Sequence, residues 1–135
     1  MKRYFLILLV IISISACSPS SNDDINQHFE YVPITSVEMP SEFTLGQTYQ
    51  IKVSYVLPNG CYRFYNHDYV YENTSRLIGA IAIVNNDATC TQAAIEGEFT
   101  INVIARQNEP YIFMFWEGRD NQGIDQYLII EVPVI

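Results

Sequence analysis

The sequence predicts an all-β domain built as a sandwich of two antiparallel sheets. From residue 32 onward, apolar residues recur at every second position, which is the spacing of a strand with one buried face. Turn-forming residues, such as those at 58–60 and 120–123, separate these runs at intervals that suit short strands. No stretch of usable length carries a helical stripe, although residues 88–95 have room for one turn. About a hundred residues follow the N-terminal segment, which is enough for one domain with its own core.

The clearest strand is 49–57, in which apolar and polar side chains alternate between two turns. Alternate side chains of a strand point to opposite faces, so one face of this strand is expected to be buried. The same pattern predicts seven strands in all: 35–39, 49–57, 62–71, 77–84, 98–105, 111–116 and 126–132. Seven short strands in a domain of this size are typical of an immunoglobulin-like β-sandwich.

The last quarter of the chain sharpens this prediction. Residues 109–116 lead through the turn at 120–123 into the alternating strand 127–132. This arrangement resembles the closing hairpin of bacterial immunoglobulin-like and fibronectin-like modules. The resemblance implies that Tyr111 forms a tyrosine corner, with its hydroxyl bonded to backbone near the entry of the strand. It implies a fold, and no function follows from it.

Residues 1–16 predict a secretory signal peptide, because Lys2 and Arg3 precede the unbroken apolar run 5–12. That run is shorter than the roughly 20 apolar residues of a transmembrane helix. Residues 14–17, Ile-Ser-Ala-Cys, resemble the lipobox of bacterial lipoproteins. The resemblance implies cleavage before Cys17 and attachment of lipid to its thiol, and an ordinary signal peptide is the alternative.

The residues after the cysteine bear on destination. Ser18 follows, where an aspartate retains some bacterial lipoproteins at the inner membrane, so the resemblance implies the outer membrane. Residues 20–24 also resemble the serine-then-acidic signal that sends many lipoproteins of the Bacteroidetes to the cell surface, although Asn22 interrupts it. We expect a lipidated cysteine and flexible tether over 17–31 and the sandwich domain over 32–135. The whole chain resembles small immunoglobulin-like lipoproteins of the Bacteroidetes, a resemblance that implies no activity.

The charge balance excludes nucleic acid as a partner. The chain has 15 acidic and 7 basic residues and a net charge of -8. Phosphate backbones demand a basic footprint. The cations beyond residue 16 are instead scattered along the chain: Lys52, Arg63, Arg76, Arg106 and Arg119. An acidic surface favours solubility, or the binding of cations or basic partners.

Cys61 and Cys90 are predicted to form a disulfide, because they are the even pair left in an oxidising envelope once Cys17 carries lipid. The bridge would tie the start of strand 62–71 to the polar loop 85–97. By the loop-entropy model it contributes roughly 3 to 4 kcal/mol to stability. The absence of a CxxC motif argues against a metal or redox role.

One strand carries most of the candidate ligand-binding residues. The side chains at its odd-numbered positions share one parity: Arg63, Tyr65, His67, Tyr69 and Tyr71. On a solvent-exposed face these rings would stack on sugars or peptide side chains, and the alternative is that they pack in the core. Trp116, beside the turn 117–123, is expected to extend that surface or to cover the end of the core.

Catalytic and metal sites are not predicted. His67 and Asp68 are neighbours on a strand and should point to opposite faces, so they do not form a dyad. The sequence has neither a nucleophile elbow nor a zinc motif. Oxygen ligands do gather around one turn, at Glu117, Asp120, Asn121 and Asp125. A calcium site is therefore an alternative, but the spacing is not an EF-hand, and Asp and Asn are ordinary turn residues.

The sequence thus predicts a lipid-anchored protein of the outer membrane that acts as a non-catalytic binding or structural module, with no cofactor. Its expected partners are the membrane, through the N-terminal lipid, and an extracellular glycan or protein. The alternatives are a glycan-binding accessory of a nutrient-uptake system and a small envelope enzyme. An exposed aromatic stripe beside a groove would favour binding, whereas His67 in a deep pocket with converging carboxylates would favour the enzyme.

Overall fold

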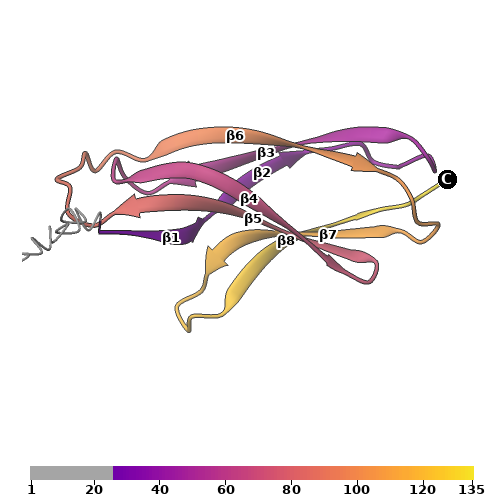
Figure 1. The fold of residues 1–135 in the computed structure, drawn as a ribbon. Coiled ribbons are helices and arrows are strands. Elements are labelled where there is room, and N and C mark those ends of the chain that lie inside the picture. Colours follow the sequence, from indigo (N-terminus) through magenta and orange to yellow (C-terminus); the bar gives the residue numbers. More distant parts are fainter. Residues whose placement is uncertain (1–25) are drawn as a thin grey trace, which may run out of the picture.

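The computed structural model describes residues 26–135, so the signal peptide, Cys17 and the acidic residues 23 and 24 lie outside it. The described chain forms two packed β-sheets (Figure 1). Its eight strands are β1 (Gln27–Val32), β2 (Ile34–Glu38), β3 (Thr48–Leu57), β4 (Tyr62–Glu72), β5 (Ser75–Asn85), β6 (Ile95–Ile104), β7 (Tyr111–Arg119) and β8 (Asp125–Val132). The predicted all-β sandwich is confirmed. Residues 26–135 include no helix with the length and hydropathy of a membrane span.

The two sheets differ in size and regularity. The larger sheet has β5 at its centre, with β4 along one edge of β5, β1 and β7 sharing the other edge, and β8 outside β7. The smaller sheet has the order β2-β3-β6. The strand pairs are antiparallel, as predicted, except that β5 and β7 run parallel where residues 75–78 pair with 112–115. Consequently β4 and β6 each have a neighbour on one side only.

The domain begins earlier than the sequence analysis predicted. Residues 27–31, assigned to the flexible tether, belong to β1, which pairs with β5 from Gln27 opposite Asn85 to Val32 opposite Ala80. The tether assignment is therefore wrong for these residues. Phe29 and Tyr31 alternate with polar residues, and they lie opposite Ile83 and Ile81 on one face. Pairing with β5 supplies backbone hydrogen bonds, so two apolar side chains are enough to define a short strand.

The core lies between the sheets and is filled by the alternating apolar positions. Fully buried side chains come from both layers, among them Ile51 of β3, Ile78 of β5 and Phe113 of β7. Tyr111 is buried beside Phe113, and its hydroxyl accepts a hydrogen bond from the Arg106 N–H (2.9 Å) and donates to the Ile104 carbonyl (3.4 Å). These backbone groups lie a few residues upstream, so the predicted tyrosine-corner hydrogen bond is confirmed.

The Cys61–Cys90 disulfide is also confirmed, with the two Cα atoms 5.2 Å apart. Cys61 precedes β4, and Cys90 lies in the connection that crosses from β5 in one sheet to β6 in the other. A backbone hydrogen bond from Gly60 to Thr91 (2.8 Å) reinforces the link. A Cβ atom on Gly60 would lie 2.6 Å from the Thr91 hydroxyl, so this close approach requires glycine.

Candidate functional site

A β-bulge in β4 decides which of the predicted binding residues share a face. Phe64 lies opposite Ala82 and Asn66 lies opposite Ile81, so Tyr65 is an extra residue without a partner on β5. A bulge of this kind shifts the alternation of side chains by one position. Odd-numbered residues before and after the bulge therefore point to opposite sides of the sheet. The prediction of one face shared by Tyr65, His67, Tyr69 and Tyr71 is wrong for this reason.

Tyr65 lies on the outer side of the larger sheet, where its ring is 4.8 Å from that of Phe29 on β1. Tyr31 of β1 and Trp116 of β7 form a second pair on this side, at 5.6 Å between ring centroids. We call these four residues the outer aromatic surface. Phe29 and Tyr65 are 60% and 57% exposed, so their rings are accessible to a ligand.

Hydrogen bonds to carboxylates fix the second aromatic pair. The Tyr31 hydroxyl donates to Asp68, and this bond, with burial and the charge of Asp68, raises the pKa of Tyr31 to about 12. The indole N–H of Trp116 donates to Asp125 Oδ1 at 3.0 Å. Asp68 and Asp125 therefore already have hydrogen-bond donors.

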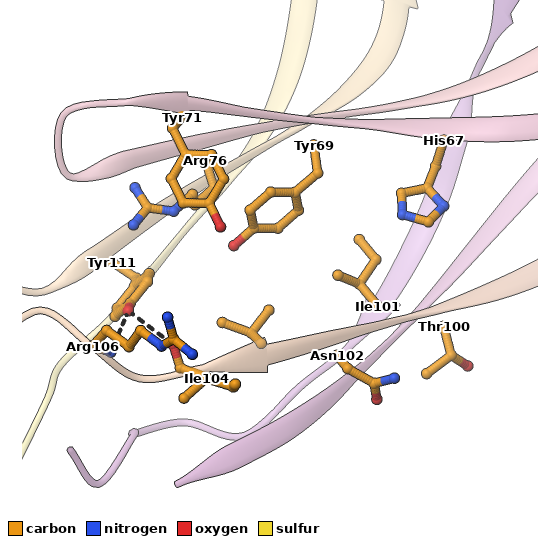
Figure 2. Close-up of a pocket in the computed structure, with 11 residues that line it drawn as sticks. His67, Tyr69, Tyr71, Arg76, Thr100, Ile101, Asn102, Ile104, Arg106 and Tyr111 are labelled. Carbon is orange, nitrogen blue, oxygen red and sulfur yellow. Dashed lines mark hydrogen bonds between the residues drawn. The ribbon is translucent and has the colours of Figure 1, made fainter. Parts of the chain in front are cut away.

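On the other side of the bulge, His67, Tyr69 and Tyr71 point into a groove between β4 and β6 (Figure 2). The groove has a volume of about 600 Å³. It lies between two sheet edges that have no further strand within residues 26–135, where β4 pairs only with β5 and β6 only with β3. Its lining residues are His67, Tyr69, Tyr71, Arg76, Thr100, Ile101, Asn102, Val103, Ile104, Arg106 and Tyr111. We call it the β4–β6 groove.

Arg76 is a buried cation at one end of this groove, only 6% exposed. Its guanidinium donates to the carbonyls of Asn73 and Ser75, both at 2.9 Å, and to Gln107 Oε1 at 2.8 Å. The Nε atom is buried and has no hydrogen-bond partner. No carboxylate of residues 26–135 forms an ion pair with it. A buried charge usually has a counter-ion, so this arrangement leaves a positive charge uncompensated.

Aromatic rings partly take the place of that counter-ion. The Arg76 guanidinium lies 4.3 Å from the centre of the Tyr71 ring and 5.0 Å from that of Tyr111. Such cation–π contacts attract the charge without neutralising it. Burial raises the pKa of the neighbouring Tyr69 to about 12, and the charge of Arg76 opposes this shift. Tyr69 is therefore a neutral hydroxyl at neutral pH, available as a donor beside a cation.

Arg106 adds a second positive charge at the same end of the groove, close to the Tyr111 hydroxyl in Figure 2. Its side chain is exposed, and the ion pairs found in residues 26–135 do not include it. The groove lining thus contains two arginines and neither aspartate nor glutamate. In a chain with a net charge of -8 this is a local reversal of charge. The groove suits an anionic ligand, and the expectation of basic partners does not extend to it.

The opposite end of the groove is aromatic and polar. His67 stacks in parallel on Phe99 of β6, with ring centroids 4.8 Å apart, and Thr100 and Asn102 lie nearby. Asp68 is on the outer side with Tyr31, so His67 and Asp68 lie on opposite faces as predicted. The carboxylates needed for the small-enzyme alternative do not converge on His67 in this lining.

Two carboxylates of the turn proposed as an alternative calcium site, Asp120 and Asp125, form hydrogen bonds within the protein. Asp120 Oδ1 accepts backbone N–H bonds from Gln122 (2.8 Å) and Ile124 (3.0 Å). Asp125 bonds to Arg119 at 2.8 Å and also to Trp116, and these two hydrogen bonds lower the pKa of Asp125. Residues 26–135 contain no cluster of three or more His, Cys, Asp or Glu side chains arranged to hold a metal ion. Asp120 therefore acts as a turn acceptor and Asp125 as an ion-pair acceptor.

Sequence reasoning missed Arg76, Arg106 and the edge of β6 as parts of a site. One signal for Arg76 was present, because it precedes Ile78, Ala80 and Ala82 in the inward-facing alternation of β5. An arginine at a core-facing position marks a buried charge that needs a partner. Comparison with models of protein families, with curated proteins and with solved structures finds no match to this chain.

Proposed function

We propose that this chain is a lipid-anchored protein of the bacterial outer membrane that binds an anionic ligand in the β4–β6 groove, without a catalytic role. The observation that carries the proposal is the pair Arg76 and Arg106 in a groove lining that contains no carboxylate. A guanidinium recognises carboxylate groups through paired hydrogen bonds. The acidic remainder of the chain repels anions, so a ligand of this charge is directed to one place.

The buried position of Arg76 supports a ligand more strongly than an exposed arginine would. The surroundings of Arg76 have a low effective dielectric constant, in which an approaching anion is attracted more strongly than at a surface. The ring of Tyr71, which covers the guanidinium, is itself 71% exposed. A ligand that packs against this ring therefore comes close to the buried charge.

The anchor depends on residues 14–17, and the Cys61–Cys90 disulfide agrees with an oxidising compartment. Metabolic labelling with a palmitate analogue tests it directly. We expect label on the wild-type chain and none on Cys17→Ser, because the serine lacks the thiol that accepts the lipid. Ser18→Ala serves as the matched control and should be labelled like the wild type. Equal labelling of Cys17→Ser would contradict the anchor.

Ligand charge is tested with two carboxylate-rich probes and their neutral counterparts. The full chain, purified in detergent, is titrated with deca-glutamate and with oligogalacturonate, and in parallel with deca-glutamine and methyl-esterified oligogalacturonate. We expect at least one anionic probe to bind more tightly than its neutral counterpart. Arg106→Gln should weaken that binding about tenfold. Arg63→Gln, at an exposed arginine of β4 outside the groove lining, should not.

The contradicting result is equal affinity for the charged and neutral probes. Loss of binding in Arg63→Gln as strong as in Arg106→Gln would also contradict the proposal, because it would show a general charge effect. Salt dependence gives a further check. Binding to Arg106 should weaken as ionic strength rises, since exposed charges are screened.

A role in glycan binding is the second candidate, and the outer aromatic surface favours it. Phe29 and Tyr65 expose their rings side by side, and such rings stack on the apolar faces of sugars. A neutral oligosaccharide that binds wild type and fails to bind Phe29→Ala would support this candidate. Binding unaffected by Phe29→Ala and Tyr65→Ala would remove it.

A further inference from the structure

The edge of β6 that borders the groove has backbone groups without a strand partner. The Ala105 N–H donates to the Gln47 carbonyl at 2.9 Å, and its carbonyl accepts from the Gly46 N–H at 2.7 Å, so this residue faces the β3 side. Backbone groups of successive strand residues point to opposite sides. Thr100, Asn102 and Ile104 therefore direct their N–H and C=O groups away from β3. The bond from the Tyr111 hydroxyl to the Ile104 carbonyl agrees with this direction.

We propose that the ligand of the β4–β6 groove is an extended, acidic segment of a partner polypeptide, which adds to β6 as the next strand of the smaller sheet. This inference rests on the proposed function, that the groove binds an anion, and names the class of that ligand. Open strand edges are templates for an added strand, and recognition of this kind combines main-chain hydrogen bonds with pockets for alternate side chains.

Both walls of the groove have the period of a strand. On the β6 wall, Thr100 and Asn102 direct their backbone groups into the groove and are two residues apart. The side chains of Ile101 and Val103, which alternate with them, are buried in the interior. On the β4 wall, the side chains of His67, Tyr69 and Tyr71 also recur at every second residue (Figure 2). Alternate side chains of an extended peptide are about 7 Å apart, which matches this repeat. A sugar chain has no comparable row of amide groups to pair with β6.

The two arginines of the groove lie at one end of it, and this predicts where the bound segment carries its carboxylate. Arg106 follows the C-terminal end of β6, and Arg76 is near the start of β5 at the same end of the groove. Tyr69 and Ile101 lie along the middle of the groove in Figure 2. The bound segment should therefore alternate apolar and polar residues and carry a carboxylate where it passes Arg106.

A displayed library of random 12-residue peptides tests the inference against the full chain in detergent. We expect enriched peptides with alternating apolar residues and an Asp, a Glu or a free C-terminus at one end. Arg106→Gln and Asn102→Pro should each weaken the binding of an enriched peptide about tenfold. Asn102→Pro removes the N–H that points into the groove, whereas the β3 ladder does not use it. Arg63→Gln, outside the groove lining, is the matched control and should bind like the wild type. Asn102→Ala removes the same side chain but keeps the N–H, so Asn102→Pro should weaken binding more than Asn102→Ala does.

Retained affinity in a folded Asn102→Pro variant would overturn strand addition. If that proline prevents folding, methylating alternate amide nitrogens of the enriched peptide tests the same hydrogen bonds, and binding that survives each methylation overturns the inference. Failure of the library to yield any Arg106-dependent peptide overturns it as well. In that case oligogalacturonate binding through Arg106 would leave the proposed function standing, and loss of both would remove both proposals.

Discussion

Strand β4 supplies side chains to two surfaces with opposite chemistry. At the outer aromatic surface Tyr65 packs on the exposed Phe29, and both nearby carboxylates, Asp68 and Asp125, have hydrogen-bond donors. In the β4–β6 groove the aromatic side chains line a space with two arginines that lack carboxylate partners. The comparison shows that the bulge at Tyr65 places this ring on one surface and the rings of His67 and Tyr69 on the other. The proposed anionic ligand follows from the local pairing of charges, and the net charge of -8 alone would not suggest it.

The largest expected loss of stability comes from removing the disulfide, which affects both surfaces together. Replacing Cys61 and Cys90 by serine frees the start of β4 from the β5–β6 connection. The free energy of unfolding should fall by about 3 kcal/mol, because the unfolded chain is no longer constrained. Urea denaturation measures this, and reductant should produce the same loss in the wild type. A double variant as stable as the wild type would show that the strand contacts alone hold β4.

Substitutions of Arg76 and Arg119 compare a buried cation with an exposed one. Arg76→Met should destabilise the domain by about 1 to 3 kcal/mol, because two carbonyls and Gln107 lose their donor. Arg119→Met breaks an exposed ion pair with Asp125, and such pairs contribute about 0 to 1 kcal/mol. Urea denaturation of both variants compares them. Equal losses would contradict the difference between the groove and the outer side.

Tyr31 at the outer aromatic surface and Tyr69 in the groove both have a raised pKa, but the main cause of the shift differs between them. The pKa of Tyr31 is raised to about 12 chiefly by its bond to Asp68, and that of Tyr69 to about 12 chiefly by burial. Ultraviolet titration of tyrosinate should show Tyr31 and Tyr69 among the late groups in the wild type. Asp68→Asn should lower the pKa of Tyr31 only, and Tyr69→Phe should remove the other late group. If both late groups move in Asp68→Asn, the two environments are coupled.

The same shifts fix the direction of a pH effect. A folded-state pKa above the ordinary value of about 10 means that the folded state holds the proton more tightly. Both tyrosines therefore stabilise the fold fully below pH 10 and lose this contribution as the pH rises toward 12. Asp68→Asn should reduce the alkaline loss of stability between pH 10 and 12, measured by denaturation at each pH. An unchanged alkaline limb would contradict the role of the Tyr31–Asp68 bond.

The smallest expected change is in the affinity of the groove when the bulge residue, Tyr65, is deleted. Deleting Tyr65 restores regular alternation, so Phe64 and His67 still face inward. The affinity of a groove ligand should therefore stay within about twofold of the wild type, whereas stacking on Phe29 is lost. Titration with the enriched peptide or the anionic probe measures this. A large loss of groove affinity would show that the bulge also shapes the groove through strand twist.

Much of the fold was predictable, because period-two alternation, paired cysteines and Tyr111 each act through local or pairwise rules. The bulge could not be predicted, because it arises from the pairing of β4 with β5. No glycine, which often occurs at a bulge, is present at or beside Tyr65 in the sequence. β1 was missed because Phe29 and Tyr31 become a strand only when β5 offers an edge. The groove required the arrangement of β4 and β6, which lie in different sheets. The one signal of the groove in the sequence was that Arg76 occupies an inward-facing position in the alternation of β5.

The pairing of β1 with β5 also places the start of the described chain far from Arg76. Gln27 lies opposite Asn85, whereas Arg76 lies at the other end of the same strand. Nine residues of strand separate these ends by about 30 Å. If Cys17 carries the proposed lipid, the anchored segment leads to the end of β1 at Gln27, whereas Arg76 lies at the other end of β5 together with Arg106 in the groove lining. Ionic screening acts over about 8 Å at physiological salt, so a negatively charged membrane surface at the Gln27 end would exert little force on an anionic ligand at the Arg76 end.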